Sequence, residues 1–229
     1  MRIAEIFHSI QGEGLLAGVP SVFVRTSGCN LRCHWCDTPY ASWKPEGPDM
    51  TVEQVLEKVL AWNSTHVVLT GGEPMIAPDL PALAARLKKA GKHITIETAA
   101  TVPPGGIACD LASLSPKLSN STPPPERDSA WAQKHEAARL QPSVITDWIK
   151  NYDFQLKFVV STEQDVTEIK DLLSRLAPVP FHRVLLMPEG IDTQTLSSRA
   201  PWLVDVCKRE GFRFCPRLQI ELFGNARGT

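Results

Sequence analysis

The chain has no hydrophobic run long enough to cross a membrane. None of its apolar stretches approaches the roughly 20 consecutive residues that a membrane-spanning helix requires. The first residues, Met1–Ile6, also lack the apolar run of a secretory signal peptide, and their pattern predicts a β-strand instead. We therefore expect a cytoplasmic protein that does not bind membranes.

The sequence also lacks an excess of charge of either sign. Lys and Arg together number 24 against 25 Asp and Glu, which gives a formal net charge of −1. This balance provides no general electrostatic reason to bind nucleic acid or anionic lipid. Charged residues make up 21% and hydrophobic residues 43% of the chain, so a sizeable core is expected rather than disorder.

Internal repeats are absent, and the one compositionally biased segment is the Ser-, Thr-, Asn- and Pro-rich stretch 118–126. Such a composition predicts a loop or lid rather than a linker between domains. Helical composition follows over about 126–150 and breaks near Pro142. We therefore expect one domain over 1–229, with a loop and helical insertion around 118–151.

Strands and helices are expected to alternate along the chain. Apolar runs predict strands at 3–10, 22–24, 66–70, 93–97, 108–114, 154–160, 183–187 and 218–222. Helical periodicity predicts helices that begin near Thr51 and Thr162, and others near 80–87 and 193–210. This alternation is typical of α/β proteins with parallel strands. A closed eight-unit barrel takes about 250 residues, so we expect an incomplete (partial) β/α barrel of about six units.

Three of the six cysteines are concentrated at Cys29, Cys33 and Cys36, with the spacing C-x3-C-x2-C. Thiolates are soft ligands that favour zinc, cuprous ions or iron–sulfur clusters over magnesium or calcium. A [4Fe–4S] cluster held by only three thiolates leaves one iron free to bind a substrate or cosubstrate. The remaining cysteines lie in or beside apolar runs and are expected to be small core residues: Cys109, Cys207 and Cys215.

Other interpretations also fit three clustered cysteines. A closed zinc site usually has four ligands, and His34 or His66 could complete it. A disulfide would leave one thiol over and is rare in the cytosol. The three cysteines could also be unreactive core residues, but the polar Asn30 and Arg32 between them argue against a buried segment. A non-enzymatic zinc- or cluster-binding protein therefore stays an alternative.

Polar residues follow the predicted strands at the point where each strand ends. These groups are Arg25 with the cysteines, Thr70–Glu73, Glu97–Thr98, Ser115–Lys117 and Met187–Glu189. The carboxyl ends of parallel strands form the rim at which α/β enzymes assemble their sites. We therefore expect these groups to form one functional site.

The cysteine stretch, together with Thr70-Gly71-Gly72-Glu73-Pro74, resembles the radical S-adenosylmethionine enzymes. The resemblance implies an open iron that binds the amino and carboxylate groups of S-adenosylmethionine. An electron from the reduced cluster then cleaves the sulfonium to a 5′-deoxyadenosyl radical. A glycyl-radical-enzyme activating protein, which uses the same cofactor on a protein partner, is an alternative within this superfamily.

Motifs along nearly the whole chain are similar to those of the 7-carboxy-7-deazaguanine synthases. They are Ile6–Gly14, Phe23–Arg25, Gly28–Leu31, Cys33–Thr38, Thr70–Pro74, Ile96–Thr98, Leu114–Lys117 and Gly224–Thr229. The resemblance implies a carbon–nitrogen lyase of queuosine-type 7-deazapurine biosynthesis. It would convert 6-carboxy-5,6,7,8-tetrahydropterin to 7-carboxy-7-deazaguanine, with ring contraction and loss of ammonia. Magnesium, a homodimer and an electron donor such as flavodoxin are also implied.

The same resemblance implies roles for individual residues. Cys29, Cys33 and Cys36 would hold the cluster, and Thr38 would ligate magnesium. The pterin and its carboxylate would be bound by Ile10, Gln11, Gly12, Arg25 and Thr70. S-adenosylmethionine would be contacted by Trp35, Asp37, Gly72, Glu73, Ser115, Pro116, Lys117, Met187, Pro188, Glu189 and Gly190. Glu97 would be a further contact to cofactor or substrate.

The sequence departs from the family pattern in three places. Ala99 stands where Asn is common, and Gln219 stands where a histidine is expected. The segment 118–151 is longer than in compact members. We expect these departures to alter the details of the pocket and its covering loop rather than the chemistry.

Overall fold

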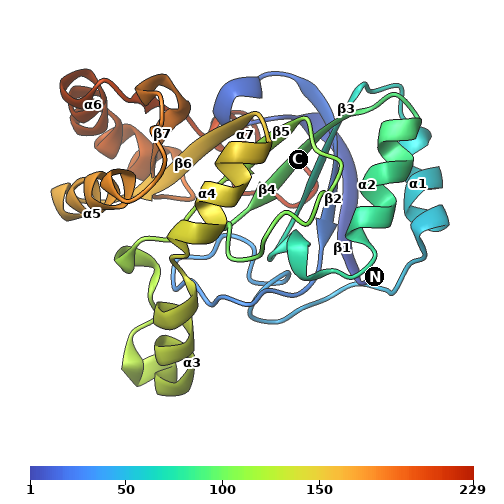
Figure 1. Ribbon diagram of the computed structural model, residues 1–229, viewed down its shortest axis with the longest axis horizontal. Helices are drawn as coiled ribbons and strands as arrows, with labels where there is room; N and C mark the ends of the chain where they lie inside the picture. Colours follow the sequence, from blue (N-terminus) through green and yellow to red (C-terminus); the bar gives the residue numbers. More distant parts are fainter.

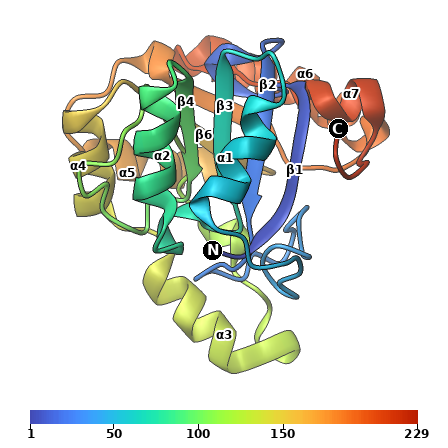
Figure 2. The same ribbon diagram turned by 90° about the vertical axis from the view of Figure 1, so that its right-hand side faces the viewer.

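A single eight-stranded sheet forms the centre of the computed structural model, which describes residues 1–229 (Figure 1). The strands pair in chain order; the first pair is antiparallel and all later pairs are parallel. They are β1 (Ile3–Ile10), β2 (Pro20–Thr26), β3 (His66–Gly71), β4 (His93–Thr98), β5 (Leu111–Leu114), β6 (Phe154–Val160), β7 (Val184–Pro188) and β8 (Arg213–Phe214). The parallel strands end together at the lower rim in Figure 2.

The sheet is not closed, because β1 and β8 are edges that pair on one side only. The predicted α/β class and partial barrel are therefore confirmed. Seven strands are parallel, against the roughly six units predicted, and the two-residue β8 is too short to produce an alternating pattern.

The prediction of a strand over 218–222 is wrong. These residues form the short helix α7 (Leu218–Phe223), of which only Ile220 is buried. A run of five residues with alternating apolar positions fits a helix turn as well as a strand, and the flanking turn residues do not decide between them.

Five helices cross between successive parallel strands and cover the outside of the sheet (Figures 1 and 2). They are α1 (Val52–Leu60), α2 (Leu80–Lys89), α4 (Pro142–Asn151), α5 (Glu163–Ser174) and α6 (Thr193–Glu210). The predicted capping box of Thr51 and Gln54 is confirmed, with hydrogen bonds of 3.2 and 2.9 Å between the two residues. The apolar sides of these helices and of the sheet enclose one core of 32 buried residues. None of the helices has the length and apolar character needed to cross a bilayer.

Between β5 and β6 the chain leaves the barrel. A short 3-10 turn, Ser119–Ser121, leads into α3 (Pro125–Ala138), which projects below the sheet (Figures 1 and 2). This is the end of the barrel at which the parallel strands finish and the cysteine loop lies. Helix α4 then returns the chain to β6, so the segment that leaves the barrel is 118–139.

Candidate active site

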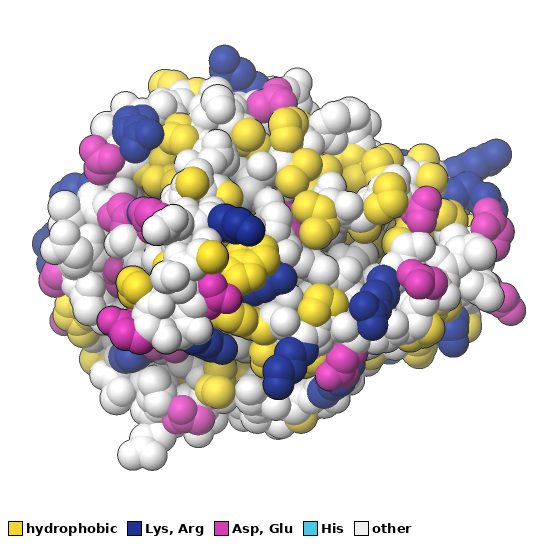
Figure 3. All heavy atoms as spheres, turned by 90° about the horizontal axis from the view of Figure 1, so that it is seen from below, with side chains coloured by type: hydrophobic (Ala, Val, Ile, Leu, Met, Phe, Trp, Pro, Cys, Tyr) yellow, Lys and Arg dark blue, Asp and Glu magenta, His cyan; other side chains and the backbone are white.

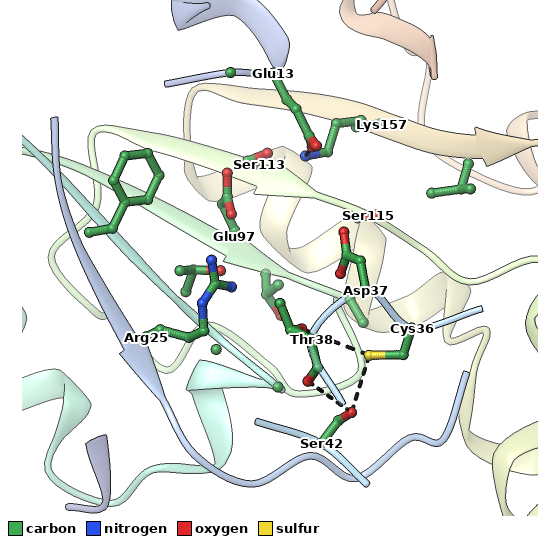
Figure 4. Close-up of a pocket in the computed structure, with 18 of the residues that line it drawn as sticks. Glu13, Arg25, Cys36, Asp37, Thr38, Ser42, Glu97, Ser113, Ser115 and Lys157 are labelled. Carbon is green, nitrogen blue, oxygen red and sulfur yellow. Dashed lines mark hydrogen bonds and ion pairs between the residues drawn. The ribbon is translucent and has the colours of Figure 1, made fainter. Parts of the chain in front are cut away.

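A cavity of about 220 Å³ lies at the carboxyl ends of the parallel strands (Figure 4). The cysteine loop after β2 and the loop after β1 line much of it, together with residues of β1 and β2. The ends of β3 to β7, the loops after β3, β4 and β5, and α7 supply most of the other lining residues. Most of the predicted site residues meet here: Ile10, Gln11, Gly12, Arg25, Cys29, Cys33, Trp35, Cys36, Asp37, Thr38, Thr70, Gly72, Glu97, Ser115, Lys117 and Met187.

Five predicted residues do not line this cavity: Glu73, Pro116, Pro188, Glu189 and Gly190. Glu73 is only 1% exposed, and burial raises the pKa of its carboxyl. It accepts hydrogen bonds from Thr98 Oγ1 at 2.7 Å and from the Ala99 N–H at 2.8 Å. The Glu73 carboxylate therefore joins the end of β3 to the end of β4.

The residues after β7 also make contacts inside the protein. Glu189 forms an ion pair with Arg199 of α6. The Gly190 carbonyl accepts a hydrogen bond from Arg217 Nη1 at 2.5 Å. This loop is thereby held between α6 and the start of α7.

The three clustered thiols face the same cavity. Burial raises the pKa of Cys29 to about 11 and that of Cys33 to about 12, so both are neutral thiols until a metal displaces their protons. Three soft thiol donors around one space, with no lysine or arginine nitrogen bonded to them, fit an iron–sulfur cluster.

Gly72 allows the loop after β3 to pack directly against the cysteine loop. A Cβ atom at this position would lie 2.3 Å from the Gly28 carbonyl oxygen and 2.7 Å from Cys29 Cβ. The Glu73 N–H donates to that same Gly28 oxygen at 3.0 Å. The Gly-Gly-Glu sequence therefore supports the start of the cysteine loop as well as lining the cavity.

Neither histidine of the zinc interpretation is placed to complete a zinc site with the cysteines. The exposed His34 has its Nε2 2.8 Å from the Asn120 carbonyl oxygen. His66 begins β3, at the opposite end of that strand, where its ring lies 4.5 Å from the ring of His93. No three His, Cys, Asp or Glu side chains converge on a position suited to one metal ion.

A buried group of charges on the other side of the cavity was missed by sequence reasoning. Glu13 Oε2 lies 2.5 Å from Lys157 Nζ, and Glu13 Oε1 lies 3.0 Å from Arg217 Nε. Burial opposes ionisation of Glu13, but Lys157 and Arg217 outweigh it and keep the pKa of this carboxyl below its usual range. Gln219 Nε2 donates to the same carboxylate at 2.7 Å. Figure 4 shows Glu13 and Lys157 pointing toward each other. The pair lies on the side of the cavity opposite the cysteine loop.

One signal could have revealed part of this group. Lys157 interrupts the apolar run of β6, where a charged residue at a buried position requires a partner. The sequence around Lys157 does not reveal which residue is the partner, since Glu13 is 144 residues away.

Arg25 reaches the cavity with part of its guanidinium free. Its Nε donates to Glu5 Oε1 at 2.6 Å, and the Tyr40 hydroxyl donates to the same oxygen at 2.7 Å. The two terminal nitrogens of Arg25 have no hydrogen-bond or ion-pair partner in the protein. The guanidinium points into the cavity in Figure 4, so its outer edge is available to an anion.

Comparison with known proteins identifies the family. Residues 23–117 match the Radical SAM superfamily. The chain is 48% identical over 230 residues to the 7-carboxy-7-deazaguanine synthase of Rhodopirellula baltica, covering 100% of this chain and 89% of that protein. The chain belongs to the 7-carboxy-7-deazaguanine synthases. The synthase of Halobacterium salinarum is 42% identical over 239 residues, covering 100% of this chain and 93% of that relative.

Solved structures of similar fold agree with the partial barrel. The crystal structure of QueE from Escherichia coli matches with a TM-score of 0.70 and 24% identity, over 95% of this chain and 93% of that chain. The structure of SuiB from Streptococcus suis bound to S-adenosylmethionine matches with a TM-score of 0.53 and 14% identity. That second match covers 81% of this chain and 44% of the other.

The family predicted from the motifs is therefore confirmed. The 7-carboxy-7-deazaguanine synthases are radical S-adenosylmethionine enzymes of the 7-deazapurine pathway, so this chain is an enzyme that uses a [4Fe–4S] cluster and S-adenosylmethionine. The activating-protein and zinc-protein alternatives are set aside by the same comparison.

Proposed function

We propose that the chain converts 6-carboxy-5,6,7,8-tetrahydropterin to 7-carboxy-7-deazaguanine, and that Arg25 binds the substrate carboxylate. The observation that carries this proposal is the arrangement of Arg25, whose Nε is held by Glu5 while both terminal nitrogens are without a partner beside the cavity. A guanidinium pairs with a carboxylate through two parallel hydrogen bonds, so the free edge suits a carboxylated ring.

The pterin ring is proposed to lie between β1 and β4. Gln11 Nε2 donates to Glu97 Oε1 at 3.1 Å, and both side chains line the cavity. Together they offer an amide and a carboxylate to the donor-rich edge of an aminopyrimidine. Ile10, Gly12 and Thr70 would complete the substrate contacts. The stacked rings of Phe7 and Phe23, with centroids 4.9 Å apart, supply an apolar wall.

Cys29, Cys33 and Cys36 would hold the cluster, and the neighbouring residues would hold S-adenosylmethionine. When bound, these two groups supply radical hydrogen abstraction. Lys117 Nζ is fixed by the Ser115 carbonyl at 2.9 Å and by Ser115 Oγ at 2.8 Å. The remaining cavity residues proposed for this cofactor are Trp35, Asp37, Gly72 and Met187.

The five predicted residues that do not line the cavity would act through the loops they hold. Glu73 fixes the turn after β3, and Pro116 lies between Ser115 and Lys117. Pro188, Glu189 and Gly190 would set the course of the loop after β7. The whole chain, 1–229, would thus work as one domain around one site.

A magnesium ion is proposed to bind at Thr38. Its hydroxyl is a hard oxygen donor of the kind that magnesium prefers, and it lines the cavity 3.8 Å from Cys36 Sγ. The neighbouring carboxylate of Asp37 is already bonded to Arg217. We also propose a homodimer, for which the exposed Leu222 and Phe223 of α7 provide apolar surface, and a one-electron donor such as flavodoxin.

An anaerobic assay tests the proposal. Cluster-loaded protein is incubated with reductant, S-adenosylmethionine, magnesium and the carboxytetrahydropterin, and the deazapurine is measured by its absorbance and mass. We expect 7-carboxy-7-deazaguanine and ammonia in equal amounts. A protein that holds its cluster and binds S-adenosylmethionine but forms no deazapurine would contradict the proposed reaction.

A further inference from the structure

The backbone around Cys33 is held by the segment 118–139 that leaves the barrel. The Arg32 N–H donates to His135 Nδ1 of α3 at 3.0 Å. On the other side of the cysteine, the His34 N–H donates to the Ser121 carbonyl oxygen, also at 3.0 Å. Cys33 therefore lies between two hydrogen bonds to the same segment.

His135 is part of a complete chain of hydrogen bonds. Its side chain is fully buried, and because Nδ1 accepts from the Arg32 N–H, a neutral ring carries its proton on Nε2. Nε2 lies 2.9 Å from Ser121 Oγ, which donates in turn to the Leu118 carbonyl at 2.6 Å. Burial lowers the pKa of His135 to about 4, so the ring is neutral at neutral pH.

The same segment is also attached to the barrel. The Asn120 side chain donates to the Val159 carbonyl of β6 at 3.1 Å, and the Asn120 backbone carbonyl accepts from Trp35 Nε1 at 2.8 Å. Arg139, at the end of α3, donates to the Lys117 carbonyl at 3.0 Å and to Glu168 of α5 at 2.7 Å. These bonds fix the segment 118–139 relative to the sheet. His135 therefore connects the cysteine loop to a part of the protein that is itself held in place.

Stacked side chains cover the outside of the cysteine loop. The Arg32 guanidinium lies 4.1 Å from the centre of the Trp131 ring on α3. Arg127, also on α3, lies 3.9 Å from the centre of the Trp43 ring, and Trp43 Nε1 donates to the Cys33 carbonyl at 2.9 Å. Figure 3 views this lower side, on which basic and apolar side chains are interspersed.

We propose that 118–139 is a clamp on the cysteine loop and that His135 is a positioning residue for Cys33. The bond from the Arg32 N–H to His135 fixes the position of the backbone next to Cys33, and with it the position of the Cys33 thiolate. Because this thiolate is a cluster ligand, the bond controls how tightly the cluster is retained. Partners that orient metal ligands commonly change metal affinity by about 10- to 100-fold when they are removed. This inference rests on the proposed function only in that the three cysteines hold a cluster.

Two substitutions separate positioning from packing. In His135→Asn the amide oxygen can replace Nδ1 as the acceptor for the Arg32 N–H. In His135→Gln the amide reaches toward Ser121 and leaves the Arg32 N–H without a partner. Gln133→Ala, on an exposed position of the same helix with no hydrogen bond, is the matched control.

The measurement is the rate at which a chelator removes iron from anaerobically loaded protein, together with the electron paramagnetic resonance spectrum of the reduced cluster. We expect His135→Gln to lose iron about 10- to 100-fold faster than the wild type, with an altered spectrum. His135→Asn should stay within about threefold of the wild type, and Gln133→Ala should not differ. Melting temperatures of the apoproteins report packing separately.

Two outcomes would overturn the proposal. Iron release from His135→Gln at the wild-type rate would show that the contact does not position Cys33. Equally fast release from both His135 variants would show that the ring only fills space. If His135→Gln does not fold, Ser121→Ala removes the hydroxyl that orients the ring, and unchanged release from that variant counts against the clamp.

The experiment is independent of the deazapurine assay, because iron release is measured without pterin. A wild type that retains iron but forms no deazapurine contradicts the proposed function and leaves the clamp in place. Normal synthesis with unchanged iron release in His135→Gln contradicts the clamp alone.

Discussion

Arg217 donates through Nη2 to the Asp37 carboxylate at 2.5 Å, although 180 residues separate them in the chain. Asp37 directly follows the third clustered cysteine, and Arg217 directly precedes α7. Through Nε the same guanidinium reaches Glu13, in the loop after β1. One buried side chain therefore joins both ends of the protein to the cysteine loop.

Replacing Arg217 should destabilise the fold as well as the site. Arg217→Met leaves the buried Glu13 carboxylate with one cation fewer, and breaking a buried ion pair in this way costs about 3 to 5 kcal/mol. Urea unfolding of the apoprotein measures this loss. Arg209→Met, which removes ion pairs of the exposed Arg209 with Glu163 and Glu210, is the control and should change stability by less than about 1 kcal/mol. Equal stability losses in the two variants would contradict this role of Arg217.

Arg25→Lys tests the proposed carboxylate anchor. Lysine keeps the positive charge but has no planar fork, so it cannot pair with a carboxylate through two parallel hydrogen bonds. Losing one hydrogen bond to a charged group costs about 1.5 to 3 kcal/mol, or a drop of roughly 10- to 150-fold in kcat/KM. Steady-state kinetics with the carboxytetrahydropterin measure this drop in kcat/KM. The control Arg86→Lys, on the outer surface, should leave kcat/KM unchanged. A wild-type kcat/KM in Arg25→Lys would place the carboxylate elsewhere.

Gly72→Ala should displace the cysteine loop. The added Cβ would lie 2.3 Å from the Gly28 carbonyl oxygen and 2.6 Å from that of Ala41, and neither backbone can move without shifting Cys29. Overpacking of this kind costs about 1 to 3 kcal/mol. We expect lower iron content after reconstitution, together with a lower apoprotein melting temperature. Iron content and melting temperature like those of the wild type would show that the loop can adapt.

His135 should make the apoprotein less stable as the pH falls. Its pKa is lowered by burial first, and then by Arg139, while Glu136 opposes the shift and Lys117 and His34 add to it. The unfolded chain takes up a proton near the ordinary pKa of 6.5, whereas the folded chain resists protonation down to about 4. The unfolded state therefore binds more protons in this range, and stability declines as the pH drops from about 6.5 toward 4.

Urea unfolding at pH 7 and pH 5 measures this effect. The loss between the two pH values should be smaller in His135→Asn, which has no titrating ring, than in the wild type. Identical losses in the two proteins would show that His135 does not contribute to the pH dependence.

The pattern of strand ends predicted much of the architecture. The limits of β6 at 154–160 agree with the prediction, because Asp153 precedes the strand, and Ser161 and the helix cap Thr162 follow it. At β8 the prediction failed, since two residues carry no periodic signal. A proline inside a helix removes a backbone hydrogen bond and usually breaks the helix, but α6 continues through Pro201, and Leu203 and Val206 beyond it are buried.

The cavity was predictable only in part. Residues that lie at strand ends, such as Thr70 and Ser115, follow from chain order, because parallel strands finish at one rim. Pairs such as Arg217 with Asp37 do not, since their meeting depends on how the sheet curves and where α7 packs. The contact of His135 with the Arg32 N–H could not be predicted either, since it depends on how α3 packs against the cysteine loop.

The proposed radical chemistry requires a cluster that the protein holds through three cysteines only, so that S-adenosylmethionine can bind to it. Electron paramagnetic resonance of the reduced, cluster-loaded protein, recorded before and after addition of S-adenosylmethionine, tests this directly. We predict that the cofactor changes the spectrum of the reduced cluster. A spectrum that stays the same at saturating S-adenosylmethionine would contradict the account.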